Sequence, residues 1–154
     1  MTNKSLRNFN SLKFEYSCES FLEVTSYEDL FKLSKEIRKS KTKYWILGEG
    51  TNVVILNDLK GIVIKNRLLG ITITDNSVES ASGENWDDLV KACLQKKLYG
   101  FENLSGIPGS VGGSPIQNIG AYGVEVSNFI DYVETINLDT GNLEVFNFEE
   151  CKFS

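Results

Sequence analysis

Five consecutive residues, Gly48-Glu49-Gly50-Thr51-Asn52, form a glycine-bearing loop that could bind an anion. Glycines let the backbone approach a ligand closely and adopt positive φ, so that successive N–H groups form a nest for a pyrophosphate. Thr51 and Asn52 would add side-chain donors. The alternative is a tight β-turn that binds nothing. The loop lacks the G-x-G-x-x-G spacing and the following helix of a Rossmann site, so a helix-dipole phosphate site is not implied.

A second candidate region, residues 100–123, holds seven of the 13 glycines and both prolines. Irregular backbone of this length is usually either functional or disordered. Disorder is disfavoured because apolar side chains recur along it, at Ile107, Val111, Ile116, Ile119 and Tyr122. A glycine-rich backbone held by apolar side chains suits a flat, uncharged ring system with main-chain donors nearby. The alternative is an elaborate loop with a structural role only.

Several kinds of site are excluded by composition. The chain has no histidine, which rules out a Ser-His-Asp triad, a Cys-His dyad and a histidine-based metal site within it. Cys18, Cys93 and Cys151 are odd in number, widely spaced and without a C-x-x-C pair, so we expect neither a disulfide framework nor a zinc site. We expect three free thiols with no catalytic role.

The bulk composition is that of a globular protein. With 154 residues, of which 41% are hydrophobic, the chain can bury a core. A net charge of -5 disfavours a nucleic-acid partner, and we interpret the basic cluster at residues 38–43 as the solvated end of a helix. The first ten residues carry no signal-peptide core, and no apolar run is long enough for a membrane span. These features predict a cytoplasmic protein.

The elements that must position the two loops follow from periodicity and capping signals. Ser26 with Asp29 predicts the start of an amphipathic helix over residues 27–39, and Asn85 with Asp88 predicts the start of a second helix. In that second helix Cys93 is expected to be a core residue. The segments expected to be strands are 21–24, 44–47, 53–56, 61–64, 71–74, 132–138 and 143–148. The fold class is therefore α+β, in two units that meet near residue 66.

Two segments of the second region carry a resemblance to a known family. Residues 105–112 (SGIPGSVG) and 115–125 (PIQNIGAYGVE) resemble the signature of the UDP-N-acetylenolpyruvoylglucosamine reductases, in the branch with the Pro-Ile-Gln-Asn-Ile-Gly-Ala-Tyr-Gly motif. The 48–52 loop resembles the pyrophosphate loop of that family, which is shared with flavoproteins of the vanillyl-alcohol-oxidase type. The match runs along the whole chain, in order.

The resemblance implies a fold and a cofactor. FAD, bound noncovalently, would lie between two small α+β subdomains of the vanillyl-alcohol-oxidase type, residues 1–66 and 67–154, of which the second is incomplete. Gly48, Glu49, Gly50, Thr51 and Asn52 would hold the pyrophosphate. The residues implied to line the adenosine and isoalloxazine walls are Ile107, Pro108, Gly109, Ser110, Gly112, Ser114, Ile116, Gly120 and Ala121. Gln117 and Tyr122 would lie nearest the reactive face of the flavin and the substrate.

The resemblance also implies a reaction. NADPH would pass a hydride to the flavin, which would reduce the enolpyruvyl group of a UDP-sugar to give UDP-N-acetylmuramate for peptidoglycan. The catalytic arginine, serine and glutamate of the family correspond to positions beyond Ser154, so no catalytic residue is expected within this chain. The C-terminal substrate domain is likewise absent. The chain purified alone is therefore expected to be inactive.

Two other functions remain open on the residues alone. One is a flavin- or nucleotide-binding module without turnover, which the reading frame beyond codon 154 would distinguish from a reductase. The other is an oxidase or dehydrogenase of the wider flavoprotein superfamily. The motif at residues 115–123 argues against the latter, because that superfamily shares mainly the pyrophosphate loop.

Overall fold

The computed structural model describes residues 3–153. Met1, Thr2 and Ser154, which bound the expected subdomain ranges, lie outside the described residues. The chain divides into two compact units. The first comprises the residues up to Leu68 together with Ile136–Asn142, and the second comprises Leu69–Thr135 together with the residues from Leu143 onward.

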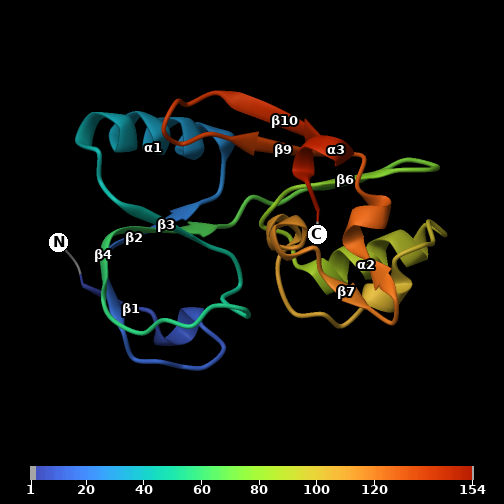
Figure 1. Cartoon of the computed structure of the whole chain (residues 1–154), viewed down its shortest axis with the longest axis horizontal. Helices are drawn as coiled ribbons and strands as arrows, with labels where there is room; N and C mark the ends of the chain where they lie inside the picture. Colours follow the sequence, from blue (N-terminus) through green and yellow to red (C-terminus); the bar gives the residue numbers. More distant parts are fainter. Residues whose placement is uncertain (1–2, 154) are drawn as a thin grey trace. The chain divides into compact units, whose positions relative to one another are not determined.

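A four-stranded sheet forms the centre of the first unit (Figure 1). Its strands, in spatial order, are β1 (Lys4–Ser5), β2 (Ser17–Val24), β4 (Leu59–Asn66) and β3 (Tyr44–Leu47). β2, β4 and β3 run parallel, whereas β1 pairs with β2 in the antiparallel sense. The expected strands 21–24, 44–47 and 61–64 are confirmed within these elements. A short 3-10 helix, η1 (Arg7–Phe9), follows β1.

Helix α1 (Tyr27–Ser40) makes the crossover from β2 to β3 and lies along one side of the sheet (Figure 1). Its start is fixed by a capping box, in which the Ser26 side chain accepts a hydrogen bond from the Asp29 N–H and the Asp29 side chain accepts one from the Ser26 N–H. Leu33 and Ile37 are buried on its inner face. The predicted helix over 27–39 is confirmed.

The other side of the sheet is covered by chain that is mostly irregular. Leu6, from the N-terminal segment, and Ile55, from the connection between β3 and β4, pack with Leu47, Val63 and Cys18 of the strands. Both segments lie opposite α1 in Figure 1. The face of β4 that carries Val63 is therefore an apolar interior.

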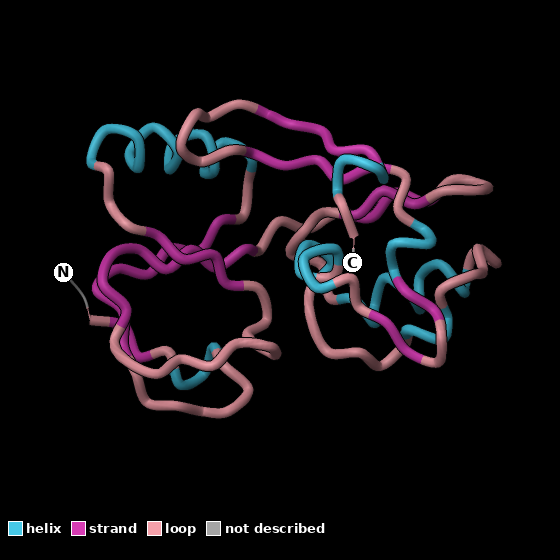
Figure 2. The backbone as a smooth tube through the Cα atoms, viewed as in Figure 1, coloured by secondary structure: helices cyan, strands magenta, loops and turns pink. Residues whose placement is uncertain are grey.

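The expected strand at residues 53–56 is wrong. These residues form a loop (Figure 2), in which Val54 and Leu56 are 61% and 72% exposed while Ile55 alone is buried. The physical reason is the parallel pairing of β3 with β4. Two parallel neighbours need a connection that returns to the starting edge of the sheet, so the segment runs back across a face and adds no strand.

The second unit begins with the hairpin of β5 (Ile71–Ile73) and β6 (Val78–Ser80). Helix α2 (Trp86–Gln95) follows, and the Asn85 side chain caps it by accepting a hydrogen bond from the Asp88 N–H. Trp86, Leu89, Val90 and Cys93 of α2 form the core with Leu104 and Val126. The predicted cap and the core position of Cys93 are confirmed.

Residues 100–131 contain short elements only. These are the 3-10 helices η2 (Glu102–Leu104), η3 (Val111–Gly113), η4 (Pro115–Gln117) and η5 (Val126–Phe129), with a hairpin of β7 (Gly120–Ala121) and β8 (Val124–Glu125). A longer hairpin follows, made of β9 (Tyr132–Ile136) and β10 (Leu143–Asn147), and α3 (Phe148–Cys151) ends the described chain. The predicted strand pair is confirmed, and α3 was not predicted.

Small separate sheets combined with helices confirm the expected α+β class. Within residues 3–153, no helix is both long enough and apolar enough to cross a membrane.

Candidate functional site

The loop at residues 48–52 follows β3 at the carboxyl-terminal edge of the parallel strands. Leu47, the last residue of β3, pairs with Lys65 near the end of β4. In open sheets of parallel strands, ligands bind outside the carboxyl ends of the strands. The loop therefore occupies the edge at which a parallel sheet presents its connections to a ligand.

Hydrogen bonds hold three carbonyl groups of this loop. The Ser11 N–H donates to the carbonyl oxygen of Gly50 at 3.0 Å, and the Ser11 hydroxyl donates to that of Thr51 at 3.4 Å. The Nζ of Lys65 donates to the carbonyl oxygen of Gly48. In a planar trans peptide the N–H points opposite to the C=O, so each contact turns the N–H of the same peptide unit away from the group that holds it. The N–H groups oriented in this way belong to Glu49, Thr51 and Asn52.

Gly50 is required by the packing of the loop itself. Its φ is +67°, and a β carbon built on it would lie 2.0 Å from the carbonyl oxygen of Phe9. Only glycine permits both the left-handed conformation and this approach of backbone to backbone. The glycine at position 50 thus allows the loop to pack against the N-terminal segment.

The only ionisable side chain of the loop, that of Glu49, faces two cations. Its Oε1 lies 2.8 Å from Lys65 Nζ and 3.8 Å from an Arg67 guanidinium nitrogen. Arg67 also lies 3.7 Å from Glu23. The negative charge of Glu49 is therefore balanced within the protein.

The second loop, which lies in the second candidate region at residues 100–123, is hydrogen-bonded to the segment that precedes α2. The Val111 N–H donates to the carbonyl oxygen of Glu84 at 2.9 Å, and the Gly112 N–H donates to that of Ser82 at 2.8 Å. A β carbon on Gly112 would lie 2.6 Å from the β carbon of Ser82. The main-chain donors of Val111 and Gly112 are thus used inside the protein, and Gly112 is needed for close packing.

The start of the second loop is held by Asp87, in the first turn of α2. The Asp87 carboxylate accepts hydrogen bonds from the Ser105 hydroxyl at 2.6 Å and the Gly106 N–H at 2.7 Å, and lies 2.7 Å from Lys91 Nζ. Together the hydrogen bonds from Lys91, Ser105 and Gly106 hold the pKa of Asp87 well below its usual range. Asp87 is therefore an anchoring carboxylate with its charge satisfied.

The predicted residues of the second loop divide by exposure. Ser110 and Ser114 are buried, and the Ser114 hydroxyl donates to the carbonyl oxygen of Val111 at 2.8 Å. Ile116 and Tyr122 are 83% and 90% exposed, although both are large and apolar. The half-buried predicted residues are Ile107, Gly109, Gly112 and Ala121, and the other exposed ones are Pro108, Gln117 and Gly120. The loop thus has an inward supporting set and an outward set available for contact.

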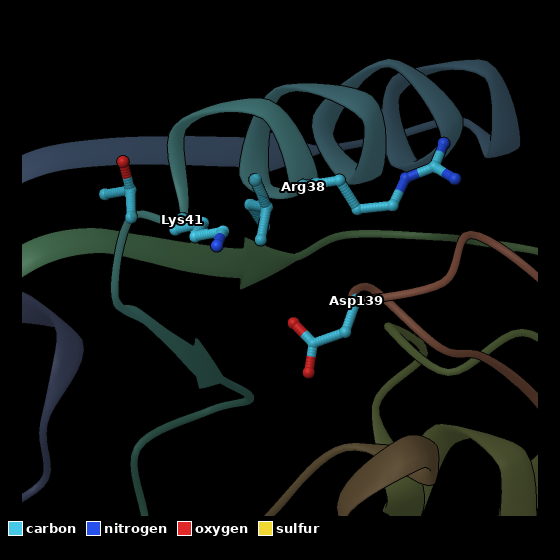
Figure 3. A pocket seen from close by; sticks show the side chains of 5 residues that line it. Arg38, Lys41 and Asp139 are labelled. Atoms are coloured by element: carbon cyan, nitrogen blue, oxygen red, sulfur yellow. The ribbon is translucent and has the colours of Figure 1, made fainter.

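Two hollows mark the surfaces of the units. In the second unit, a pocket of about 570 Å³ is lined by residues of the β7–β8 hairpin, including Gly120, Ala121 and Glu125. In the first unit, a pocket of about 410 Å³ lies between the end of α1 and the tip of the β9–β10 hairpin, beside Arg38, Lys41 and Asp139 (Figure 3). None of the predicted site residues lines the pocket of the first unit.

Most of the chain matches a known protein family. A family model described as FAD binding domain matches residues 19–147. The chain belongs to this family. The matched range contains both glycine-bearing loops, Lys65 and the segment before α2, whereas the N-terminal segment that holds Gly50 lies before it.

Curated relatives of this FAD-binding domain cover nearly all of the chain. It is 40% identical over 154 residues to a UDP-N-acetylenolpyruvoylglucosamine reductase of Shewanella oneidensis and 41% identical over 155 residues to one of Buchnera aphidicola subsp. Schizaphis graminum. These alignments cover 97% and 98% of the chain and 45% of each relative. The chain thus spans less than half the length of the curated relatives that it matches.

A solved structure gives the same resemblance at the level of the fold. The crystal structure of UDP-N-acetylenolpyruvylglucosamine reductase from Thermus caldophilus matches with a TM-score of 0.78 and 25% sequence identity. The match covers 97% of this chain and 53% of that chain. The predicted resemblance to this reductase family is confirmed.

The residues of the first loop suit the diphosphate of FAD. The peptide units at Glu49, Thr51 and Asn52 direct their N–H groups away from the contacts that hold the loop, and the Glu49 carboxylate is balanced by Lys65. Among residues 3–153 there is no group of three or more cysteine, aspartate or glutamate side chains that could hold a metal ion.

Sequence reasoning missed Lys65, which the structure places directly behind the first loop. Its position did carry a signal. In the run Ile62-Val63-Ile64-Lys65, alternation puts Lys65 on the same face as the apolar Val63, in a strand that is buried on both faces. Asp87, whose carboxylate anchors the second loop, was missed as well.

Proposed function

We propose that the chain binds FAD and that the loop at residues 48–52 holds its pyrophosphate. The observation that carries the proposal is the position of this loop at the carboxyl edge of the parallel strands, with the N–H groups of Glu49, Thr51 and Asn52 turned away from the contacts that hold it. Membership in the FAD-binding domain family supports the same assignment.

For the second loop we propose two roles. The exposed side chains of Ile116, Gln117 and Tyr122 would make direct contacts, the first with the cofactor and the other two near the substrate. Ser110, Gly112 and Ser114 would act by keeping the loop in shape. The remaining residues proposed to line the cofactor are Ile107, Pro108, Gly109, Gly120 and Ala121. An exposed apolar surface of this kind suits a flat ring system.

The reaction proposed for the whole protein is the reduction of UDP-N-acetylenolpyruvoylglucosamine, as the names of the curated relatives suggest, with NADPH as the proposed hydride donor. Bound FAD would supply hydride transfer in both half-reactions. The residues of this chain would bind and orient the cofactor. We also propose a cytoplasmic location and, from the net charge of -5, that the protein has no nucleic-acid partner.

The pyrophosphate assignment is tested by placing one negative charge on the loop. Asn52→Asp is nearly isosteric at an exposed position, and it should weaken FAD binding at least about 10-fold through like-charge repulsion. Asn57→Asp is the matched control, because Asn57 is also exposed and lies in the same connection between β3 and β4. Dissociation constants are measured by quenching of flavin fluorescence.

Riboflavin, which has no pyrophosphate, serves as the second ligand in this experiment. The Asn52→Asp variant should bind riboflavin as the unsubstituted chain does, and Asn57→Asp should bind both ligands normally. Equal FAD affinity of the two variants would refute the assignment of the loop. The proposed reaction is tested separately, by following NADPH absorbance with and without the enolpyruvyl substrate in the full-length protein.

A further inference from the structure

Lys65 is a buried lysine in a strand that is otherwise apolar on that face. Its side chain is 3% exposed, and it lies on the same face of β4 as Val63 and directly opposite Leu47 of β3. A lysine is rarely buried to this degree, because removing an ammonium group from water is costly unless it is paired and hydrogen-bonded. The protein keeps a charge here that a branched aliphatic residue could replace.

Both polar contacts recorded for the Lys65 ammonium are to the adjoining loop. Nζ donates to the carbonyl oxygen of Gly48 and to Glu49 Oε1, the latter at 2.8 Å. Burial of the Lys65 end lowers the local dielectric and strengthens its attraction to Glu49, although the Glu49 side chain is 33% exposed. Lys65 thus fixes one peptide unit and one side chain of the loop at the same time.

These two contacts have separate consequences for a bound anion. The contact with Gly48 turns the Glu49 N–H outward, because the two groups belong to one planar peptide. The contact with Glu49 neutralises a carboxylate that would otherwise repel a diphosphate bound by the same loop. Without Lys65, the Glu49 carboxylate would be balanced only by Arg67, whose guanidinium nitrogen lies farther away, at 3.8 Å.

We propose that Lys65 is a positioning residue for diphosphate binding, which acts from behind the loop by holding Gly48 and neutralising Glu49. The proposal rests on the proposed function of the loop at residues 48–52. It assigns to Lys65 no contact with the ligand. The ligand class is an adenine nucleotide that carries a diphosphate, such as FAD or ADP.

The test is a double-mutant cycle in the 154-residue chain. Lys65→Met removes the charge and the donor with little change of volume, and it should weaken binding of FAD and of ADP at least about 10-fold. Glu49→Gln retains an oxygen acceptor for Lys65 and removes the negative charge, so it should tighten binding by about 2-fold or more. The double variant should recover most of the affinity lost in Lys65→Met, because the repelling charge is gone.

Lys60→Met is the matched control, because Lys60 is exposed on the same strand and its loss should leave both affinities unchanged. Riboflavin affinity should be the same in all variants. If Lys65→Met does not fold, Glu49→Gln decides alone: unchanged or weaker FAD binding in that variant would overturn the proposal. Where Lys65→Met folds, unchanged FAD affinity, or a loss that Glu49→Gln does not reverse, would also overturn it.

The outcome is separable from that of the proposed function. An unsubstituted chain that binds FAD no better than riboflavin would contradict the pyrophosphate loop itself. If the chain prefers FAD but Lys65 and Glu49 show no coupling, the loop keeps its assignment. Lys65 is then not a positioning residue.

Discussion

The indole N–H of Trp86 donates a hydrogen bond to the carbonyl oxygen of Leu104 at 2.8 Å, and both residues are buried. Trp86 is the first residue of α2, whereas Leu104 ends η2 at the start of the second loop. The bond therefore joins the helix to the loop in the interior of the second unit. Because both residues are buried, loss of this bond leaves the Leu104 carbonyl oxygen with only the long, 3.5 Å hydrogen bond from the Ile107 N–H.

Trp86→Phe should accordingly lower the free energy of unfolding by about 1–3 kcal/mol. Trp45→Phe is the control, since Trp45 is 38% exposed and its N–H lies 3.3 Å from its acceptor at an exposed site, and a change below about 0.5 kcal/mol is expected there. Urea unfolding followed by circular dichroism measures both. Equal effects of the two substitutions would contradict the buried bond.

Gly50→Ala should destabilise the first unit by about 2 kcal/mol or more, because alanine is strained at φ +67° and its β carbon would meet the Phe9 carbonyl group. Gly113→Ala is the control. Gly113 has no positive φ, and a β carbon there would make an ordinary 3.5 Å contact with Ser110, so its effect should stay within about 0.5 kcal/mol. Loss of FAD in a Gly50 variant would thus report on the folding of the loop, and the charge substitution at Asn52 is the sharper test of ligand contact.

Asp87 should make part of the stability depend on pH. Its pKa is depressed in the folded chain, so its contribution is present above the unfolded carboxyl pKa of about 3.9 and is lost as the pH falls through the folded value. Asp87→Asn should therefore lower the urea midpoint at pH 6 and differ less from the unsubstituted chain at pH 3. Asp88→Asn, at a carboxylate that is 68% exposed in the same turn, should have a smaller effect at pH 6. If the difference in urea midpoint between Asp87→Asn and the unsubstituted chain is as large at pH 3 as at pH 6, the charge of Asp87 does not contribute to stability as proposed.

The cysteines should react as three free thiols in denatured protein without reductant. Burial raises the pKa of each thiol, which disfavours the reactive thiolate. Cys151 is only half-buried, so in the native chain it should be labelled before Cys18 and Cys93. Mass spectrometry of the labelled protein over time gives both the order and the total. A total of one or none would indicate a disulfide.

Local signals predicted the helices α1 and α2 and most strands because the causes of these elements are local. Ser26 with Asp29 and Asn85 with Asp88 lie three residues apart, and the capping hydrogen bonds form over that distance. The run at residues 53–56 misled because four apolar residues carry no information about a partner strand. What decides its course is the pairing of β3 with β4, which is a tertiary fact.

The sequence predicted where the candidate site lies better than it predicted the contacts that hold the site together. Glycine spacing identified both loops, yet the reason for Gly50 is a contact with Phe9, some forty residues away in the chain. Similarly, Gly112 serves its contact with Ser82. Charge balance at Glu49 depends on Lys65, whose strand position is visible in the sequence but whose partner is not. Long-range packing of this kind has no short-range signature.

The first unit is discontinuous in sequence, since it includes Ile136–Asn142. Leu138 is buried there, and Thr140 supplies the carbonyl oxygen that accepts a hydrogen bond from Arg38 at 2.6 Å. During synthesis, α1 therefore emerges about a hundred residues before its acceptor, and the unit is completed only after the ribosome has passed residue 142. Residues 69–135 of the second unit are made in that interval, so the chain of the first unit is complete only after most of the second has been synthesised.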